Sequence, residues 1–294
     1  MLSKSLTFLL FFLFILSFPG FAHDKSRDCD STKTWNWEDF KSELEKFQKK
    51  GKPALSLSYG FSKINLKDLN SSFAKPNLIE LKLGHSSENP VDFDEITKYR
   101  FTNVFLSYIS TELSKKNAGN GLRSNLWRFG GSYSSGYGYN FGDQSIVLFN
   151  SGSFNWSRLD LKDFPTDTQE KDRLDRFNNS FRFGTSAEGG IRFKIIPLIA
   201  VEAGYERAII FERHLFWKWL GSEVIYFTGQ GILDAFIHEI KDSSPIAAPV
   251  VSFILKSALS YGIYELRQEK MNWPFASAAP LAYDQFKFGI SFTF

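Results

Sequence analysis

Apolar and polar residues alternate along much of the chain with the two-residue period of a β-strand, whose successive side chains point to opposite faces. The segment 283–294 shows the pattern most clearly. One of its faces consists of Phe286, Phe288, Ile290, Phe292 and Phe294. The other face consists of Gln285, Lys287, Gly289, Ser291 and Thr293. The segment is therefore predicted to be a strand that separates an apolar environment from a polar one.

Other segments have the same alternation or the apolar composition of a strand. They are 55–62, 79–84, 99–110, 127–139, 146–159, 181–194 and 198–211. In the first of them, large apolar residues alternate with serine and glycine. Together with 283–294, these segments predict an all-β, antiparallel up-and-down arrangement of eight strands.

The first residues have the features of a secretory signal peptide. Lys4 supplies a positive charge, residues 6–18 form an apolar run, and small residues precede a cleavage site after Ala22. The run is short for a membrane-spanning helix, which needs roughly 20 residues. We therefore expect residues 1–22 to be removed on export.

An export signal, alternating strands and a last strand ending on Phe294 together resemble the bacterial outer-membrane β-barrel proteins. The resemblance is to the superfamily and identifies no subfamily. It implies a porin-like transmembrane barrel over residues 52–294 in the outer membrane of a Gram-negative bacterium. It also implies that outer-membrane lipids surround the barrel and that the barrel-assembly machinery recognises the aromatic face of 286–294. A soluble periplasmic β-sandwich is the alternative.

The lengths of the connections test this interpretation, because such barrels have short periplasmic turns and long external loops. The connections 140–143 and 195–197 are short, as expected for turns, whereas 85–98 is longer than a turn requires. The connections 113–125, 162–180 and 212–282 are predicted to be external.

The last external connection contains an apolar insert, residues 213–275. Two stretches in it, 214–241 and 245–269, can form helices, and Ser244-Pro245 is a suitable helix start. We favour a helical hairpin over two additional strands, which would make a ten-stranded barrel. A membrane-spanning helix is disfavoured, because Lys256 near its centre would cost roughly 2.5–3.5 kcal/mol.

The segment 23–51 precedes the barrel, and 37–50 within it reads as an amphipathic helix with Phe40, Leu44 and Phe47 on one face. We expect this helix in the periplasm, either against the base of the barrel or at the membrane surface.

Composition narrows the choice of function. The 35 basic and 32 acidic residues nearly balance, so a nucleic-acid partner is not indicated. One cysteine allows no internal disulfide, and the chain has no Cys/His cluster typical of a zinc site. The mean hydropathy of −0.22 argues against a bundle of membrane helices. No cofactor or metal is therefore predicted.

The inward faces of the strands carry charges of both signs. These are Glu80, Lys82, Arg128, Arg182, Glu188, Arg192, Lys194, Glu202 and Glu206. An eight-stranded barrel is just wide enough for its interior to be filled by side chains. We expect an ion-pair network that plugs the lumen, with a narrow selective pore as the alternative. The aromatic residues predicted to lie at the membrane interface are Trp127, Tyr137, Tyr139, Trp156, Trp217 and Trp219.

Candidate catalytic and metal-binding motifs are weak. His85-Ser-Ser-Glu88 contains the side chains of a Ser/His/acid hydrolase, but neighbouring strand residues point to opposite faces. Asp92, Asp94 and Glu95 could bind Ca²⁺, although carboxylates in a turn are usually only solvated. His238-Glu239 lacks the second histidine of a zinc protease.

The sequence thus predicts an outer-membrane barrel without catalytic residues, acting as a structural or binding barrel or as a narrow channel. The insert is the expected functional feature: it could cap the lumen, lie on the outer leaflet or bind a partner protein. The alternative is a lipid-modifying enzyme in which the insert forms a wall for acyl chains.

Overall fold

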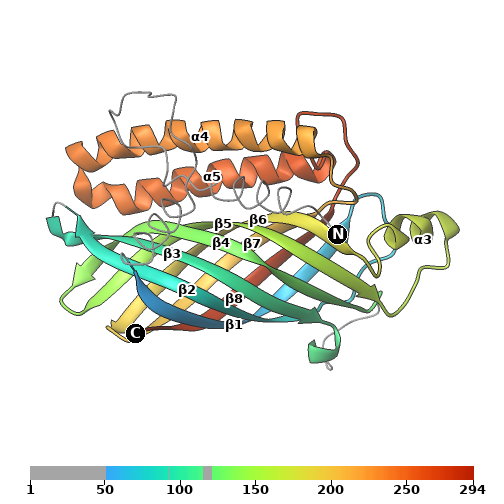
Figure 1. Ribbon diagram of the computed structural model, residues 1–294, viewed down its shortest axis with the longest axis horizontal. Helices are drawn as coiled ribbons and strands as arrows, with labels where there is room; N and C mark the ends of the chain where they lie inside the picture. Colours follow the sequence, from blue (N-terminus) through green and yellow to red (C-terminus); the bar gives the residue numbers. More distant parts are fainter. Residues whose placement is uncertain (1–50, 92, 115–120) are drawn as a thin grey trace, which may run out of the picture.

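The computed structural model describes residues 51–91, 93–114 and 121–294. Eight antiparallel strands close into a barrel in which each strand pairs with its neighbours in sequence and the last pairs with the first (Figure 1). The strands are β1 (Lys52–Leu66), β2 (Asn77–Val91), β3 (Phe93–Ser110), β4 (Ser124–Phe141), β5 (Gln144–Leu161), β6 (Phe181–Ile196), β7 (Ile199–Ile210) and β8 (Leu281–Thr293). The predicted eight-stranded fold is confirmed. The signal peptide and the helix predicted at 37–50 lie outside the described residues.

The two ends of the barrel differ in the length of their connections. At one end, which we call the turn end, β2–β3, β4–β5 and β6–β7 are joined within a few residues, and β8 finishes there. Gly142 has a φ of +68°, which glycine adopts readily, and it lies in the β4–β5 turn. The other end, the loop end, carries the long connections. This is the predicted alternation of short turns and long loops.

One predicted connection is wrong. The segment 85–98 belongs almost entirely to strands, because β2 continues to Val91 and β3 begins at Phe93, with His85 opposite Thr102 and Glu88 opposite Tyr99. Residues 85–90 carry no large apolar side chain on either face, so they lack the alternation that identified the other strands. The ladder continues there because backbone pairing needs no apolar face.

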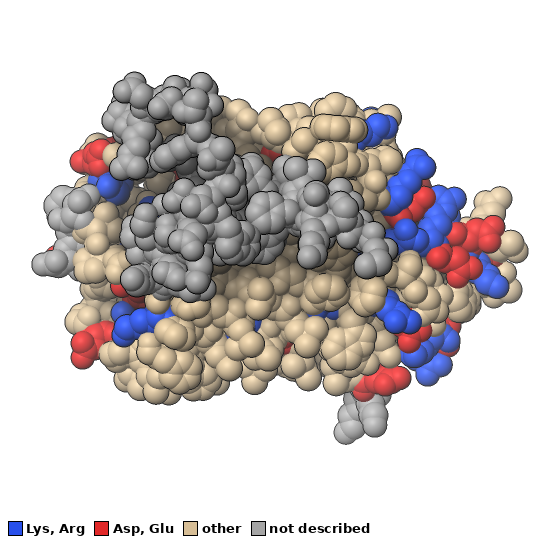
Figure 2. Space-filling model, in the orientation of Figure 1, with Lys and Arg blue, Asp and Glu red and all other residues tan. Residues whose placement is uncertain are grey.

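The barrel wall is apolar outside and polar inside. Outward side chains such as Leu57, Phe61 and Val104 are 52%, 55% and 63% exposed, whereas inward serines and charged residues are buried. Figure 2 shows charged side chains gathered at the two ends, with uncharged wall between them. This is the reverse of a soluble protein and is the pattern expected of a barrel surrounded by lipid.

Helices lie in three of the long connections. Between β5 and β6 lies α3 (Thr168–Asp175), which is capped by Asp167. Between β7 and β8 lie α4 (Phe216–Ser243), the short η3 (Pro245–Ala247) and α5 (Ala248–Glu269). Another short helix, η2 (Glu112–Ser114), follows β3. The predicted helical hairpin is confirmed, and the ten-stranded alternative is wrong.

The hairpin, α4 to α5, lies along the outside of the barrel and extends over its full height (Figure 1). It leaves β7 at the loop end and turns at the turn end, where the Tyr139 hydroxyl donates to the Ile246 carbonyl at 2.7 Å. It then returns along the wall, with α5 packed against β4, β5, β6 and β7. In the described part of the chain, Pro245–Glu269 is the one helical stretch long and apolar enough to cross a membrane.

Candidate functional site

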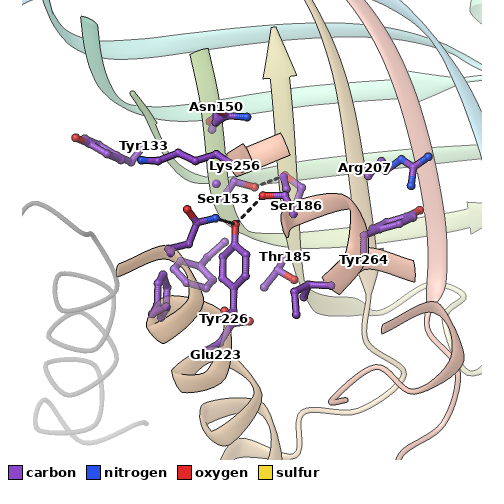
Figure 3. A pocket seen from close by; sticks show the side chains of 18 of the residues that line it. Tyr133, Asn150, Ser153, Thr185, Ser186, Arg207, Glu223, Tyr226, Lys256 and Tyr264 are labelled. Atoms are coloured by element: carbon purple, nitrogen blue, oxygen red, sulfur yellow. Dashed lines mark hydrogen bonds between the residues drawn. The ribbon is translucent and has the colours of Figure 1, made fainter. Parts of the chain in front are cut away.

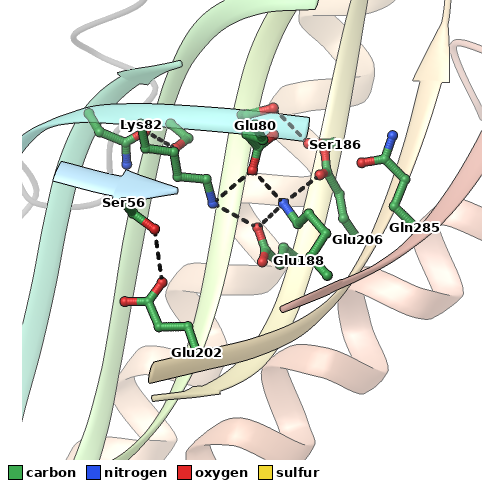
Figure 4. A network of polar contacts seen from close by, with 12 residues as sticks. Ser56, Glu80, Lys82, Ser186, Glu188, Glu202, Glu206 and Gln285 are labelled. Atoms are coloured by element: carbon green, nitrogen blue, oxygen red, sulfur yellow. Dashed lines mark hydrogen bonds and ion pairs between the residues drawn. The ribbon is translucent and has the colours of Figure 1, made fainter. Parts of the chain in front are cut away.

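The middle of the lumen holds an ion-pair network (Figure 4). Lys287 of β8 lies at its centre. Its ammonium donates to Glu80 at 2.9 Å, and to Glu188 and Glu206 at 2.8 Å each. Lys82 adds a second ammonium, 3.2 Å from Glu188 and 3.4 Å from Glu80. All five residues are buried. Strands distant in sequence supply them, because alternate side chains of each strand point into the barrel.

Arg128 completes this network toward the loop end. Its guanidinium donates to Glu206 at 2.7 Å and to Gln285 at 3.3 Å, and the residue is completely buried. The rings of Tyr283 and Phe105 lie 4.7 Å and 5.3 Å from the guanidinium carbon. Three carboxylates therefore face two ammonium groups and one guanidinium, so the buried charges balance.

A second polar group lies in the lumen toward the turn end. Glu88 accepts from Arg192 at 2.8 Å and from Lys194 at 2.7 Å. The Nε of Arg192 also donates to Glu202 at 3.2 Å, and its guanidinium lies 4.9 Å from the Tyr99 ring.

Apolar side chains fill the lumen on either side of the charges. At the loop end, inward residues of the strands pack with Leu174 of α3 and with the Phe177 that follows it. At the turn end the buried cluster is Ala54, Tyr99, Phe101, Val147 and Phe149. Apolar clusters thus lie on both sides of the polar groups along the lumen.

The predicted lumen residues, apart from Arg182, take part in these two polar groups. Arg182 forms no ion pair within the described residues, and its Nε lacks a hydrogen-bond partner there. The sequence prediction omitted Lys287 and Glu88. The inward position of Lys287 was evident from the alternation of the last strand, whereas Glu88 lay in a segment taken for a connection.

The wall beneath the hairpin differs from the rest of the outer surface, because its outward residues are small or polar. Asn150 of β5 donates to the hydroxyl of Ser257 on α5 at 2.8 Å. A Cβ added at Gly189 of β6 would lie 3.2 Å from that hydroxyl and 3.5 Å from the Phe253 ring. Small residues allow this close approach of helix and strand, as they do between membrane helices.

A cavity of about 120 Å³ remains between the hairpin and the wall (Figure 3). Barrel residues such as Ser135 and Thr185 form one side of it. On the helical side, Tyr226 bonds Ser260 at 3.0 Å and accepts from Gln230 at 2.9 Å. Polar side chains therefore line part of this cavity, although it lies on the outside of the barrel.

Ion pairs bind the hairpin to itself and to the wall. Between the two helices, Arg267 lies 3.0 Å from Glu223 and Lys256 lies 2.6 Å from Asp234. Arg207 of β7 reaches Glu265 of α5 at 2.8 Å. Lys256, the residue that argued against a membrane-spanning helix in the sequence, is thus paired, as are other charged residues of the hairpin.

The predicted interface aromatics have different environments. Trp127 and Trp156 face outward near the loop end. The Trp127 ring centroid lies 4.5 Å from that of Tyr108, and the Trp156 ring centroid lies 6.0 Å from that of Phe129. Tyr137 and Tyr139 lie on β4 toward the turn end, and Trp217 is 78% exposed. Trp219 differs from the prediction. It is buried, because α4 turns it toward the wall, where it packs with rings that include Phe154, Phe183 and His214.

The weak catalytic and metal motifs do not assemble into a site. Glu88 points into the lumen and binds Arg192, whereas His85 is exposed on the outer face. Residue 92 and the side chain of Asp94 lie outside the described part. Within the described part, no group of three His, Cys, Asp or Glu residues could hold a metal ion. The aromatic face of β8, from Phe286 to Phe294, points outward.

No family model matches the chain, and no curated protein matches it. Among solved structures, Neisserial surface protein A is similar over 82% of this chain and 97% of its own, with 10% identity and a TM-score of 0.38. The Ail attachment invasion locus protein of Yersinia pestis is similar over 83% of this chain and 99% of its own, with 6% identity and a TM-score of 0.31. Likenesses this low carry no argument about function.

Proposed function

We propose that this protein is an integral outer-membrane barrel with a closed lumen, which holds a helical hairpin in the bilayer and acts as a structural or binding barrel. The apolar outer wall supports insertion into lipid, because large exposed apolar surfaces are rare on soluble proteins. The turn end would face the periplasm and the loop end the exterior, since short turns are periplasmic in such barrels.

The main support for a closed lumen is the contact of the Lys287 ammonium with three carboxylates. This ammonium contacts Glu80, Glu188 and Glu206 within 2.9 Å, with Arg128 fully buried beside them. Buried charges are costly unless they are paired, and here three cations face three carboxylates. Such a network favours a fixed plug over a water-filled channel.

The position of the hairpin supports a location within the bilayer rather than a role as a cap over the lumen. It lies outside the barrel, and its far surface carries exposed apolar residues that include Val224, Ile232 and Ile254. The lipid-modifying alternative has no supporting observation, because the side chains of its candidate triad point to different faces.

The test uses the mature chain refolded into liposomes, in its full form and with residues 213–275 deleted. Folding is checked first by heat-dependent mobility on a detergent gel. We expect neither form to admit small sugars in a swelling assay, with a general porin as positive control. Swelling by the full chain would overturn the closed lumen. Swelling only after deletion would show that the hairpin, rather than the network, closes the barrel.

A further inference from the structure

The outer wall carries two neighbouring cations at the turn end of β3, beside the hairpin. On the outward face of β3, Lys98 and Arg100 follow the buried Ile96 and precede Thr102 and the apolar residues from Val104 onward. The cations therefore lie just below the apolar band. Arg100 is exposed and Lys98 is half-buried, with its ammonium 5.5 Å from the centre of the Tyr137 ring.

The hairpin brings further charge to this place. Lys241 of α4 and Lys256 of α5 are both close enough to interact electrostatically with Lys98, and so are Arg100 and Asp234. Asp234 is already paired with Lys256 at 2.6 Å. Lys241 in turn lies 3.7 Å from Asp242. The four cations of this cluster therefore face two carboxylates, which leaves an excess of positive charge.

Lys98 and Arg100 have no carboxylate partner within the described residues. Elsewhere on the wall beside the hairpin, Arg207 is paired, with Glu265 at 2.8 Å and Asp284 at 4.0 Å. Cations at membrane depth are costly unless an anion or water compensates them. Two adjacent cations without an ion-pair partner among the described residues, beside Tyr137 at the edge of an apolar band, fit the phosphate of a lipid headgroup.

We propose that Lys98 and Arg100, beside the part of the hairpin near its turn, bind an anionic phospholipid of the periplasmic leaflet. This inference rests on the proposed membrane function, which places the turn end in the periplasm. The phosphate would contact the two cations while the acyl chains lie along the apolar wall above them.

The test is native mass spectrometry of the refolded mature chain after equilibration with phosphatidylglycerol or phosphatidylethanolamine. The double variant Lys98→Gln/Arg100→Gln is compared with Lys63→Gln/Arg158→Gln. The control removes the same charges from outward positions on β1 and β5 near the loop end. Every protein is first shown to be folded and inserted in vesicles by heat-dependent gel mobility and co-flotation.

We expect the wild type and the control to retain phosphatidylglycerol more than phosphatidylethanolamine, by a factor on the order of ten. The Lys98/Arg100 variant should lose this preference. Equal retention of both lipids by the wild type would overturn the lipid site while leaving the barrel proposal intact. An undiminished preference in the Lys98/Arg100 variant would do the same. Failure of the wild type to insert into vesicles would overturn both proposals.

Discussion

Lys256 of α5 and Asp234 of α4 form an ion pair, with 2.6 Å between Nζ and Oδ1, near the middle of the hairpin. The lysine side chain is only 14% exposed. A lone lysine at the centre of a membrane helix would be unfavourable, but one paired to the neighbouring helix is neutralised where it lies. The pair therefore permits an apolar hairpin with a central charge to lie against the barrel in lipid.

The first prediction follows from this pair. Asp234→Asn should lower the stability of the folded protein by about 1 kcal/mol, because it leaves the largely buried Lys256 without its counter-charge, although the Asp234 side chain is itself 42% exposed. Urea unfolding in lipid vesicles, followed by tryptophan fluorescence, measures the change. Asp242→Asn is the matched control, since Asp242 is exposed at the end of the same helix. Equal effects of the two variants would show that the central pair has no special role.

The second prediction concerns the lumen. Glu206→Gln should destabilise the barrel by roughly 3–5 kcal/mol, since it removes one partner of a buried pair and leaves Arg128 and Lys287 with excess charge. The same unfolding experiment measures it. Glu265→Gln is the control, because it weakens a pair in which the glutamate is 45% exposed, and such pairs contribute about 1 kcal/mol or less. A loss below that of the control would contradict a tightly packed network.

The strands could be predicted from the sequence because each separates two environments. The positions of Leu57 and Phe286 on one face, against Ser58 and Lys287 on the other, follow directly from that alternation. The rule fails where a strand leaves the apolar band. At His85 to Glu88 both faces are polar, so the pattern disappears although the ladder continues.

The candidate site was less predictable, because it depends on which residues meet in space. Periodicity placed Lys82, Glu188 and Glu206 inside the barrel, but contacts among them depend on how the strands are staggered around it. The hairpin likewise showed helical spacing in the sequence. Its position outside the wall depends on small residues such as Gly189 of a distant strand, which alternation alone does not connect to α5.

The third prediction tests that position. Gly189→Leu should displace α5 from the wall, because the new side chain would meet Ser257 and Phe253. Limited proteolysis of the vesicle-bound protein should then cut within the hairpin several-fold faster. Gly152→Leu is the matched control, since a Cβ there has no neighbour within 4 Å and faces the cavity. Equal cleavage rates for Gly189→Leu and the wild type would show that α5 does not pack against Gly189.

The fourth prediction concerns pH. His214 lies in the connection between β7 and α4, where the ring centroids of Phe183 and Trp219 lie 4.9 Å and 5.4 Å from its own, and this partial covering of the imidazole lowers its pKa. The folded state therefore favours neutral histidine. Its contribution to stability should be full above the unfolded pKa of about 6.5 and should fall as the pH drops below that value. Unfolding at pH 7.5 and pH 5 measures this, and His214→Gln should reduce the difference. An unchanged difference would assign the pH dependence to other groups.

The fifth prediction concerns the path of the hairpin across the membrane. Arg213 precedes α4 at the loop end and Ser243 ends α4 at the turn end, and both are exposed. In a Cys29→Ser background, which removes the single cysteine, a membrane-impermeant maleimide should label Arg213→Cys in intact cells. Ser243→Cys should react only after the outer membrane is permeabilised, because the hairpin carries that position to the periplasmic side. Labelling of both positions in intact cells would mean that the hairpin lies on the cell surface, and the bilayer-embedded arrangement would be wrong.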